Sequence, residues 1–444
     1  MKDKVKILLI VIAILTTTIA VAQEKKSISL RDAINLSIKS SKQLKISAAK
    51  IEEANAALKE SERRKLPDVA ASASYLRLSS ANVDLKKQNN NSGGTGNSGE
   101  TPSISQAAYA ILNASLPIYA GGRIRYGIES SRYLAQAAKL DAENDEEDLI
   151  ENTVEAYINL FKAKTAVDLV NENLAQAQQR VKDLSNLEKN GLLPRNDLLK
   201  AELQVSNTEL SLLDAQNNWE LANLNMNLML GLPEKTILEP DSSLLQQNFS
   251  VKPLDDYLHS AYNNRKDIAA LDLRKQAAQT GVKATKGEYY PSVQLTGGYI
   301  AADIPKLVTI TNAVNAGVGV SYNIGSLWKT KAKVQGAEAR AKQLMASEEL
   351  LDDHIRLQVN KTYLTWLSNQ KKIEVYAKAI EQANENYRIV KNKFNNSLAT
   401  TTEVLDADVA QLQAKLNYVF AKADAVVVYN QLLQAAGQAE QIIK

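Results

Sequence analysis

Two short runs within residues 289–324, in which side chains alternate in character, limit the possible folds more than any other part of the chain. Their apolar or small members are Val293, Leu295, Gly297 and Tyr299, then Val314, Ala316, Val318, Val320 and Tyr322. A period of two places each set on one face of a β-strand. Each run has about nine residues, close to the ~9–11 that a tilted strand needs to cross a bilayer. The pattern fits a membrane strand with lipid on its apolar face, and it also fits a soluble hairpin with one solvated face.

The same plan occurs twice along the chain. Residues 68–78 and 109–118 also alternate, and their predicted apolar faces are Val69, Ala71, Ala73 and Tyr75, then Leu112, Ala114, Leu116 and Ile118. Between them, residues 79–108 are polar and rich in glycine, which predicts an exposed, mobile loop. Pro67 corresponds to Pro291 and Tyr75 to Tyr299, both at an offset of 224 residues. Such agreement indicates an internal duplication.

Long segments without proline and with little glycine flank both strand pairs and predict long helices. We expect them at residues 27–66, 123–190, 254–287 and 326–394. Heptad spacing predicts that Val167, Val170, Leu174, Ala177, Val181 and Leu184 pack against a returning helix. We expect the returning helices to contribute Leu199, Leu203, Leu210, Leu213, Leu224 and Leu228 in the first half, and Leu405, Val409, Leu412 and Leu416 in the second.

These patterns predict the domain organisation. We expect a signal peptide at 1–22 and an irregular connector at 234–253. The first repeat is expected at 23–233, with a strand pair at 68–118 and a hairpin tip near 191–197. The second repeat is expected at 254–444, with a strand pair at 292–323 and a tip near 395–403.

The first residues indicate export. A basic start precedes an apolar run at 7–15 and small residues at Ala20 and Ala22, which is typical of a secretory signal peptide. The chain has no cysteine, which excludes disulfides and thiol-bound metals. Its net charge is +3, and the part after Ala22 has a charge of +1, so composition gives no support for nucleic-acid binding. No apolar run of about 18 residues follows Ala22, so we expect any membrane insertion to use a closed barrel.

Several segments, taken in their order, carry a family resemblance. Residues 264–299 (NRKDIAALDLRKQAAQTGVKATKGEYYPSVQLTGGY) and 66–75 (LPDVAASASY) look like two copies of a helix-to-strand signature, residues 116–124 (LPIYAGGRI) look like a strand exit, and residues 224–233 (LNMNLMLGLP) look like a helix end. Together they resemble the TolC-like outer membrane efflux protein family. The helix–strand junctions in this pattern are Pro67, Gly121, Gly122, Pro291 and Gly325.

The resemblance implies a membrane α+β fold. Three chains would each give four strands to one shared transmembrane β-barrel, continuous with a long periplasmic α-helical barrel of coiled-coil hairpins. Four strands alone cannot close a bacterial barrel, whose lower limit is about eight, so more than one copy is needed. The number three follows from the resemblance alone. It also implies an outer membrane location with a periplasmic extension.

No motif for chemistry stands out. The two histidines, His259 and His354, are far apart in sequence and lie in predicted helices, and no phosphate loop, nucleophile elbow or metal-binding spacing is present. The acidic run at 145–148 suits a solvated helix face. We therefore expect neither an enzyme nor a cofactor or metal site.

Two acidic residues near the second tip have two possible roles. Glu403 and Asp406 are three residues apart, on one face of a predicted helix. Repeated around an axis, they would form anionic rings that select cations. They could instead be first-turn acids that stabilise a helix start. The resemblance favours a constriction at the periplasmic entrance.

The two tips are also candidate docking surfaces. Gly191, Leu192, Leu193, Pro194, Ser397 and Leu398 resemble the sites where periplasmic adaptor hairpins dock, although turn geometry alone would require Gly191. The resemblance places an arginine at position 399, where this chain has Ala399, and a tyrosine at Phe394; Asp197 is retained. We therefore expect closure mainly by apolar packing and not by a charge link to Asp197.

The sequence predicts the outer membrane channel of a tripartite efflux or type I secretion system, a passive duct for substrates passed on by an inner-membrane pump and a periplasmic adaptor. The alternative is an exported periplasmic coiled-coil scaffold without a channel.

Overall fold

The computed structural model describes residues 25–81, 104–243, 249–305, 307–439 and 441. The predicted signal peptide and residues 82–103 of the predicted loop lie outside this part of the chain. The fold divides into two compact units. Within these described ranges, the first unit draws on residues 25–49, 140–268 and 350–441, and the second on residues 50–139 and 269–349. None of the helices formed by the described residues is long and apolar enough to cross a membrane.

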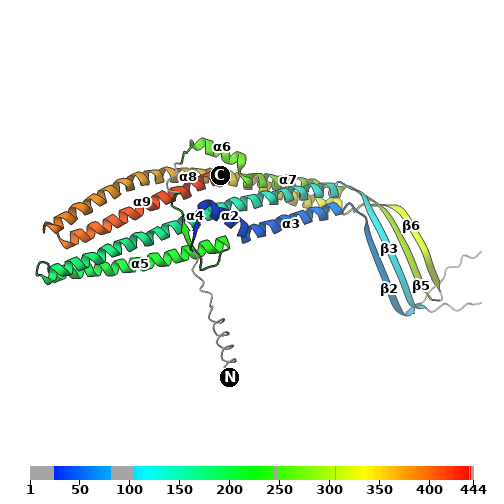
Figure 1. The fold of residues 1–444 in the computed structure, drawn as a ribbon. Coiled ribbons are helices and arrows are strands. Elements are labelled where there is room, and N and C mark those ends of the chain that lie inside the picture. Colours follow the sequence, from blue (N-terminus) through cyan, green and yellow to red (C-terminus); the bar gives the residue numbers. More distant parts are fainter. Residues whose placement is uncertain (1–24, 82–103, 244–248, 306, 440, 442–444) are drawn as a thin grey trace, which may run out of the picture. The chain divides into compact units, whose positions relative to one another are not determined.

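The second unit contains a four-stranded antiparallel sheet (Figure 1). Its strands are β2 (Asp68–Ala81), β3 (Ile104–Ala120), β5 (Ser292–Ile304) and β6 (Val308–Ser321), hydrogen-bonded in that order. The four strands are where the alternating pattern predicts them, but they have 13 to 17 residues and are longer than the predicted runs. The extra residues extend the strands into segments where side-chain alternation is weak.

The strand register gathers the predicted apolar residues on one face of the sheet. Cross-strand neighbours on this face form the rows Val69–Ala114–Gly297–Ala316, Ala71–Leu112–Tyr299–Val314 and Leu116–Leu295–Val318. The opposite face has the rows Ser115–Thr296–Gly317 and Asn113–Gly298–Asn315. Val314 is 77% exposed and Val318 is 67% exposed. No layer formed by the described residues therefore covers this broad apolar face.

One strand departs from the predicted alternation. The register shifts between Pro117 and Tyr119, so that Tyr119 and not Ile118 lies opposite Val293. Ile118 is the extra residue at this shift, and Tyr119 takes the paired position next to Pro117 in the register. A bulge inserts one unpaired residue and interrupts the period of two.

Each predicted first helix is in fact two helices. Residues 27–66 form α2 (Leu30–Ser40) and α3 (Lys42–Arg63), and residues 254–287 form α6 (Leu254–Asn264) and α7 (Lys266–Lys286), which is followed by the short 3₁₀ helix η2 (Gly287–Tyr289). The breaks fall at Ser41 and Arg265, where ψ is 122° and 129°. Ser41 Oγ accepts a hydrogen bond from Leu44 N and so starts the second helix. Both breaks obey the offset of 224 residues, so the duplication includes them.

Two short strands were not predicted. β1 (Lys25–Ile28) and β4 (Ile237–Pro240) pair in parallel, so the segment at 234–253 is not entirely irregular. Tyr157 is fully buried beside them; its hydroxyl donates to Ile28 O and accepts from Asp241 N, at 2.8 Å each. Strands of four residues carry too little alternation to be recognised in a sequence.

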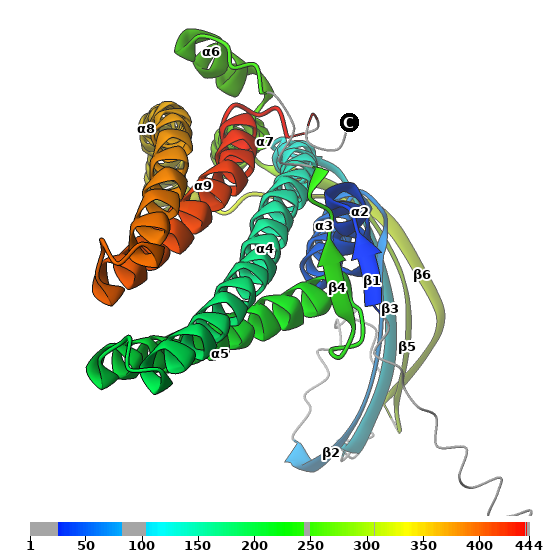
Figure 2. The ribbon, with the colours of Figure 1, turned by 60° about the vertical axis from the view of Figure 1, so that its left-hand side comes forward.

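The first unit contains two helical hairpins. They are formed by the part of α4 (Arg123–Lys189) from residue 140 on with α5 (Arg195–Leu230), and by the part of α8 (Ser326–Asn395) from residue 350 on with α9 (Thr401–Ala435) (Figures 1 and 2). The α4 seam is largely as predicted, since Val170, Leu174, Ala177 and Leu184 are buried. The α5 seam is wrong. Leu199, Leu203, Leu210, Leu213 and Leu228 are 48–63% exposed, and the buried residues are Leu198, Ala201, Thr208, Ala215, Asn223, Met226, Asn227 and Leu230.

The acidic run at 145–148 is not a solvated helix face, because all four of its residues are partly buried. Ser47 Oγ donates to Asp145 at 2.6 Å, and Gln434 Nε2 donates to Asp148 at 2.8 Å. Burial raises the pKa of Glu147 to about 7 against the opposing charge of Lys266. Tertiary packing therefore overrides the prediction made from charge density.

The junctions between sheet and helix depend on close backbone contact. Gly121 and Gly122 have φ of 63° and 80°, which glycine adopts without strain. A Cβ on Gly121 would lie 2.2 Å from Gly287 O. Pro67 and Pro291 immediately precede β2 and β5, and the Gly325 amide donates to Asn323 Oδ1 at 3.0 Å before α8 begins. The sequence did not single out Gly287.

Replacing Gly121 with alanine should destabilise the second unit by at least ~1–3 kcal/mol, since it adds both a clash and a strained backbone. Gly127→Ala is the matched control, because Gly127 lies inside α4 with open space around it, and there alanine should be neutral or stabilising by ~0.5–1 kcal/mol. The yield of folded protein in the membrane fraction and the urea midpoint would measure both effects. Equal midpoints for the two variants would contradict the proposed close contact.

Candidate functional site at the helical tips

The two hairpin turns of the first unit share one hydrogen-bonding pattern. Gly191 N donates to Glu188 O and Leu192 N to Leu187 O, and at the second tip Ser397 N donates to Phe394 O and Leu398 N to Lys393 O. Gly191 and Ser397 both have positive φ, at 72° and 60°. This is the Schellman arrangement that ends a helix. Ser397 adopts it without the freedom of glycine, which explains why the sequence signal is weaker at the second tip.

Each turn exposes a leucine at the same point. Leu192 is 73% exposed and Leu398 is 75% exposed. Leu193 packs against the apolar cluster of Leu184, Leu198 and Ala201 just behind the tip, and Pro194 is the N-cap residue of α5. The predicted docking residues therefore lie together at two corresponding turns, each with an unpaired apolar side chain at its end.

Glu403 has the helix-capping role considered from the sequence. Its carboxylate accepts hydrogen bonds from Thr400 N at 2.6 Å and Thr400 Oγ1 at 2.9 Å, while Glu403 N donates to Thr400 Oγ1. This reciprocal pair is a capping box. The hydrogen bond from the Thr400 backbone is the main reason that the pKa of Glu403 is lowered, so it stays ionised. Asp406 is exposed, like Glu403.

Apolar packing joins the two hairpins near the tips. Phe394 of α8 packs against the cluster of Leu184, Leu198 and Ala201, which belongs to α4 and α5. Asp197 accepts from Lys200 at 3.2 Å within its own helix, and Lys200 also donates to Thr402 of the other hairpin at 3.3 Å. Ala399 offers no charge to this region.

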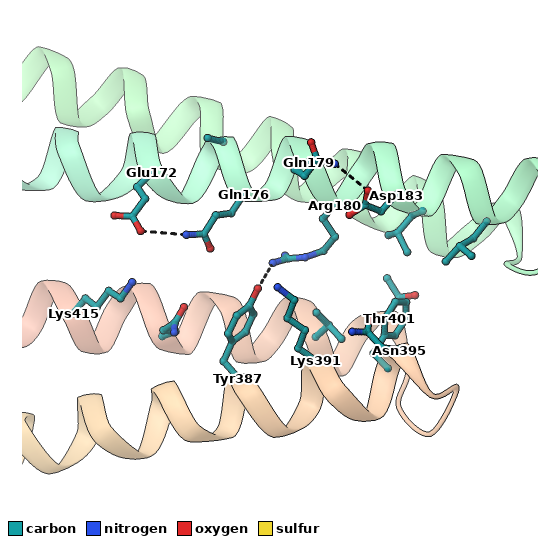
Figure 3. A pocket seen from close by; sticks show the side chains of 16 residues that line it. Glu172, Gln176, Gln179, Arg180, Asp183, Tyr387, Lys391, Asn395, Thr401 and Lys415 are labelled. Atoms are coloured by element: carbon teal, nitrogen blue, oxygen red, sulfur yellow. Dashed lines mark hydrogen bonds between the residues drawn. The ribbon is translucent and has the colours of Figure 1, made fainter.

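A buried polar network, which the sequence did not reveal, lies farther from the tips. Arg180 of α4 donates through Nη1 to Asp408 Oδ2 of α9 at 3.1 Å. Through Nη2 it donates to the Tyr387 hydroxyl of α8 at 3.0 Å (Figure 3). Asn173 also donates to Asp408 Oδ2 at 3.1 Å. The side chain of Asp408 is 1% exposed and that of Arg180 is 13% exposed. The network connects three helices of the two hairpins.

Contact with Asp408 keeps Arg180 ionised despite its burial. Burial alone would lower the pKa of Arg180, but the hydrogen bond and the charge of Asp408 outweigh it and raise the pKa. Asp408 Oδ1 is buried and makes no hydrogen bond with any described residue. Asp408 therefore accepts its side-chain hydrogen bonds, from Asn173 and Arg180, through Oδ2.

The network borders a groove of about 710 Å³ between the hairpins. Figure 3 shows that Arg180 and Asp183 come from one hairpin, while Tyr387, Lys391 and Thr401 come from the other. Within the described residues, no group of three or more His, Asp or Glu side chains could hold a metal ion.

Asp408 lies on the buried face of α9, which the sequence pattern did not locate correctly. Thr401, Val404, Leu405 and Asp408 are buried, while Val409 is 48% exposed. The predicted seam through Leu405, Val409 and Leu412 was therefore wrong at Val409, because the apolar residue lies one position beyond the packing face. A buried acid in a seam is found in sequence only when its cationic partner is known, and Arg180 is 228 residues away.

Comparison with known proteins identifies the family. The chain matches the outer membrane efflux protein family over residues 33–232 and 257–438. The chain belongs to this family. The predicted family is confirmed, and its description favours an outer membrane efflux protein over a periplasmic scaffold. The family is one of transport proteins and not of enzymes.

Individual relatives agree with this assignment. Outer membrane efflux protein BepC of Brucella suis biovar 1 (strain 1330) is 23% identical over 350 residues, which cover 77% of this chain and 75% of BepC. Toxin and drug export protein A of Aggregatibacter actinomycetemcomitans is 23% identical over 343 residues, covering 72% of this chain and 70% of that protein. The CmeC outer membrane channel of Campylobacter jejuni superposes with a TM-score of 0.78 at 18% identity, covering 92% of this chain and 86% of CmeC. The fold is that of this channel family.

Arg180→Met should destabilise the first unit by ~3–5 kcal/mol, because it leaves the buried Asp408 side chain without its cationic partner. The double variant Arg180→Met/Asp408→Leu should recover most of this loss, since it removes both charges. Lys391→Met is the control, because Lys391 lies on the same groove but is exposed. Urea unfolding followed by helical circular dichroism would measure all three. Additive losses in the double variant would show that the pair is not coupled.

Proposed function

We propose that three copies of this chain form one outer membrane duct, through which substrates leave after an inner-membrane pump and a periplasmic adaptor have passed them on. The observation that carries the proposal is the sheet with one exposed apolar face and one small, polar face. Lipid on the first face and water on the second would satisfy both. The duct itself performs no chemistry.

The sheet edges support assembly. Strands β2 and β6 each pair with only one neighbour in the sheet. Open edges are not tolerated in lipid, because their unpaired amide and carbonyl groups have no water to bond. Pairing β6 of one copy with β2 of the next removes both edges. Three copies would supply twelve strands, above the lower limit of about eight for a closed barrel; the number three is carried over from the family.

The helices support the same assembly. Besides the exposed leucines of α5, helix α8 has Leu350, Leu357 and Leu364 at seven-residue spacing, 63–71% exposed. A heptad stripe of exposed leucines is suited to coiled-coil packing, and the described part of the chain leaves both stripes uncovered. Neighbouring copies would cover them and complete a helical barrel.

Labels placed on β6 test the membrane assignment. After reconstitution, probes at cysteines introduced at Val318 and Val320 should be shielded by acyl chains, because these side chains lie on the apolar face. Probes at Asn315 and Ser321 should be open to aqueous quenchers. The native chain has no cysteine, so the labels are unique. Aqueous exposure at the two valines together with lipid exposure at the two polar positions would overturn the pore.

We also propose that Glu403 and Asp406 line the periplasmic constriction. Both are exposed in the single chain, and capping uses Glu403 without burying it. Repetition around the axis would place several carboxylates close together, which favours cations.

The tip residues Gly191, Leu192, Leu193, Pro194, Asp197, Ser397 and Leu398 would meet the adaptor, with the exposed Leu192 and Leu398 as its apolar contacts. The names of BepC and of toxin and drug export protein A leave both small-molecule and protein export open as the class of substrate.

Closure should depend on packing and on the buried network instead of on Asp197. Opening is a rearrangement of hairpins between two states, and links between hairpins hold the closed one. In planar bilayers, Asp408→Ala should increase single-channel conductance because it breaks the link between α9 and α4. Asp197→Ala is the comparison and should have little effect, since its partner Lys200 lies on the same helix. A larger gain from Asp197→Ala than from Asp408→Ala would refute this account of closure.

A further inference from the structure

Basic residues are concentrated where the strands of the second unit meet its helices. We use the name junction collar for residues 60–68, 121–133, 281–291 and 324–334. Its eleven basic residues are all exposed: Arg63, Arg64, Lys65, Arg123, Arg125, Arg132, Lys283, Lys286, Lys329, Lys331 and Lys333. Only five acidic residues occur in the same segments. The whole chain has 53 basic and 50 acidic residues, so the rest of the chain has an acidic excess.

The junction collar also exposes large aromatic and aliphatic side chains. Trp328 is 65% exposed and Tyr290 is 58% exposed, as are Ile324 at 65% and Leu66 at 59%. On α8, Ser326, Thr330 and Val334 form the buried face, so Trp328 lies on the other side of that helix. Tryptophan and tyrosine are typical of the boundary between membrane and water, where the ring contacts apolar chains and the polar atom contacts water.

Three of these cations form ion pairs with described residues, and four form none. Arg64 pairs with Glu60, Lys286 with Glu338 and Lys333 with Glu288. In contrast, Arg63, Lys65, Lys329 and Lys331 form no ion pair with any described residue. Free, exposed cations beside interfacial aromatics are suited to the phosphate groups of a lipid headgroup layer.

We propose that the junction collar binds anionic phospholipids of the periplasmic leaflet of the outer membrane. The inference rests on the proposed membrane position of the sheet. Each of the four strands enters or leaves the junction collar at one end (Figure 1), so the basic residues lie at the level where headgroups begin. The occupant is the phosphate of a glycerophospholipid with net negative charge, and Trp328 sits among its glycerol and upper acyl groups.

The expected strength is modest and sensitive to salt. Basic residues near an anionic surface contribute about 1 kcal/mol each, which is about a fivefold change in binding. Exposed charges are screened over about 8–10 Å at physiological salt. A lipid phosphate that contacts one such cation should therefore be preferred about two- to fivefold over zwitterionic lipid once screening is included, and the preference should weaken as salt is raised.

Tryptophan quenching can measure this preference in the full-length protein. The protein would be reconstituted in vesicles containing brominated phosphatidylglycerol or, at the same mole fraction, brominated phosphatidylcholine. Trp366 is 4% exposed and Trp219 is partly buried, so Trp328 should give the lipid-dependent signal. Trp328→Phe should abolish the difference between the two lipids.

A charge-matched pair of variants tests the role of the junction collar. Arg63→Gln/Lys65→Gln/Lys329→Gln/Lys331→Gln should lower the preference to about one. The control Lys361→Gln/Lys371→Gln/Lys372→Gln/Lys378→Gln removes four exposed lysines elsewhere on α8 and should leave the preference unchanged.

Equal quenching by both lipids in the native protein, or an unchanged preference in the junction-collar variant, would overturn the inference. So would an altered ion selectivity of the channel without a lipid preference, since it would place these charges in the pore. Absence of quenching by either lipid would instead contradict the membrane position of the sheet, and with it the proposed function.

Discussion

The unpaired backbone groups at the two edges of the sheet determine how this chain can assemble. Backbone hydrogen bonds join the four strands to one another, but in this sheet β2 and β6 each pair on one side alone. In water such edges are a risk of aggregation, and in lipid they are intolerable. The apolar face is also exposed over Val314 and Val318. Pairing with other copies would complete the hydrogen bonds at the edges, and lipid would cover the apolar face. The other features of the protein follow from this requirement.

The helices have two separate sets of apolar residues for two tasks. Leu198, Ala201 and Leu230 pack within the chain, whereas other leucines of α5 and α8, such as Leu203 and Leu357, remain exposed. A helix in a single-layered barrel wall has neighbours on two sides, so it needs two separate stripes. The partition therefore fits a wall built from several copies better than a self-contained coiled coil.

Features that repeat with a regular period were predictable, and single exceptions were not. Alternation located all four strands, and the offset of 224 residues revealed the duplication. The bulge beside Tyr119 and the breaks at Ser41 and Arg265 change only one residue each, which is too little to alter a periodic signal. The α5 seam failed because a sequence shows which residues are apolar but not which chain covers them. Glu403 was predictable as a capping residue because its partner, Thr400, is local.

The Arg180–Asp408 pair shows why distant polar contacts escape prediction and why they matter. A buried ion pair gives little net stability, because desolvation of both charges offsets their attraction. Its removal is costly only when one charge remains alone. Such a pair therefore discriminates between arrangements: it favours the one packing of the hairpins in which Arg180 meets both Asp408 and Tyr387. Any movement that separates α4 from α9 must rehydrate both groups, and the adjoining groove offers the space for water to reach them. The apolar contacts around Phe394 could adapt to small shifts, but the geometry of the ion pair could not. This contrast makes the network the better candidate for a two-state lock.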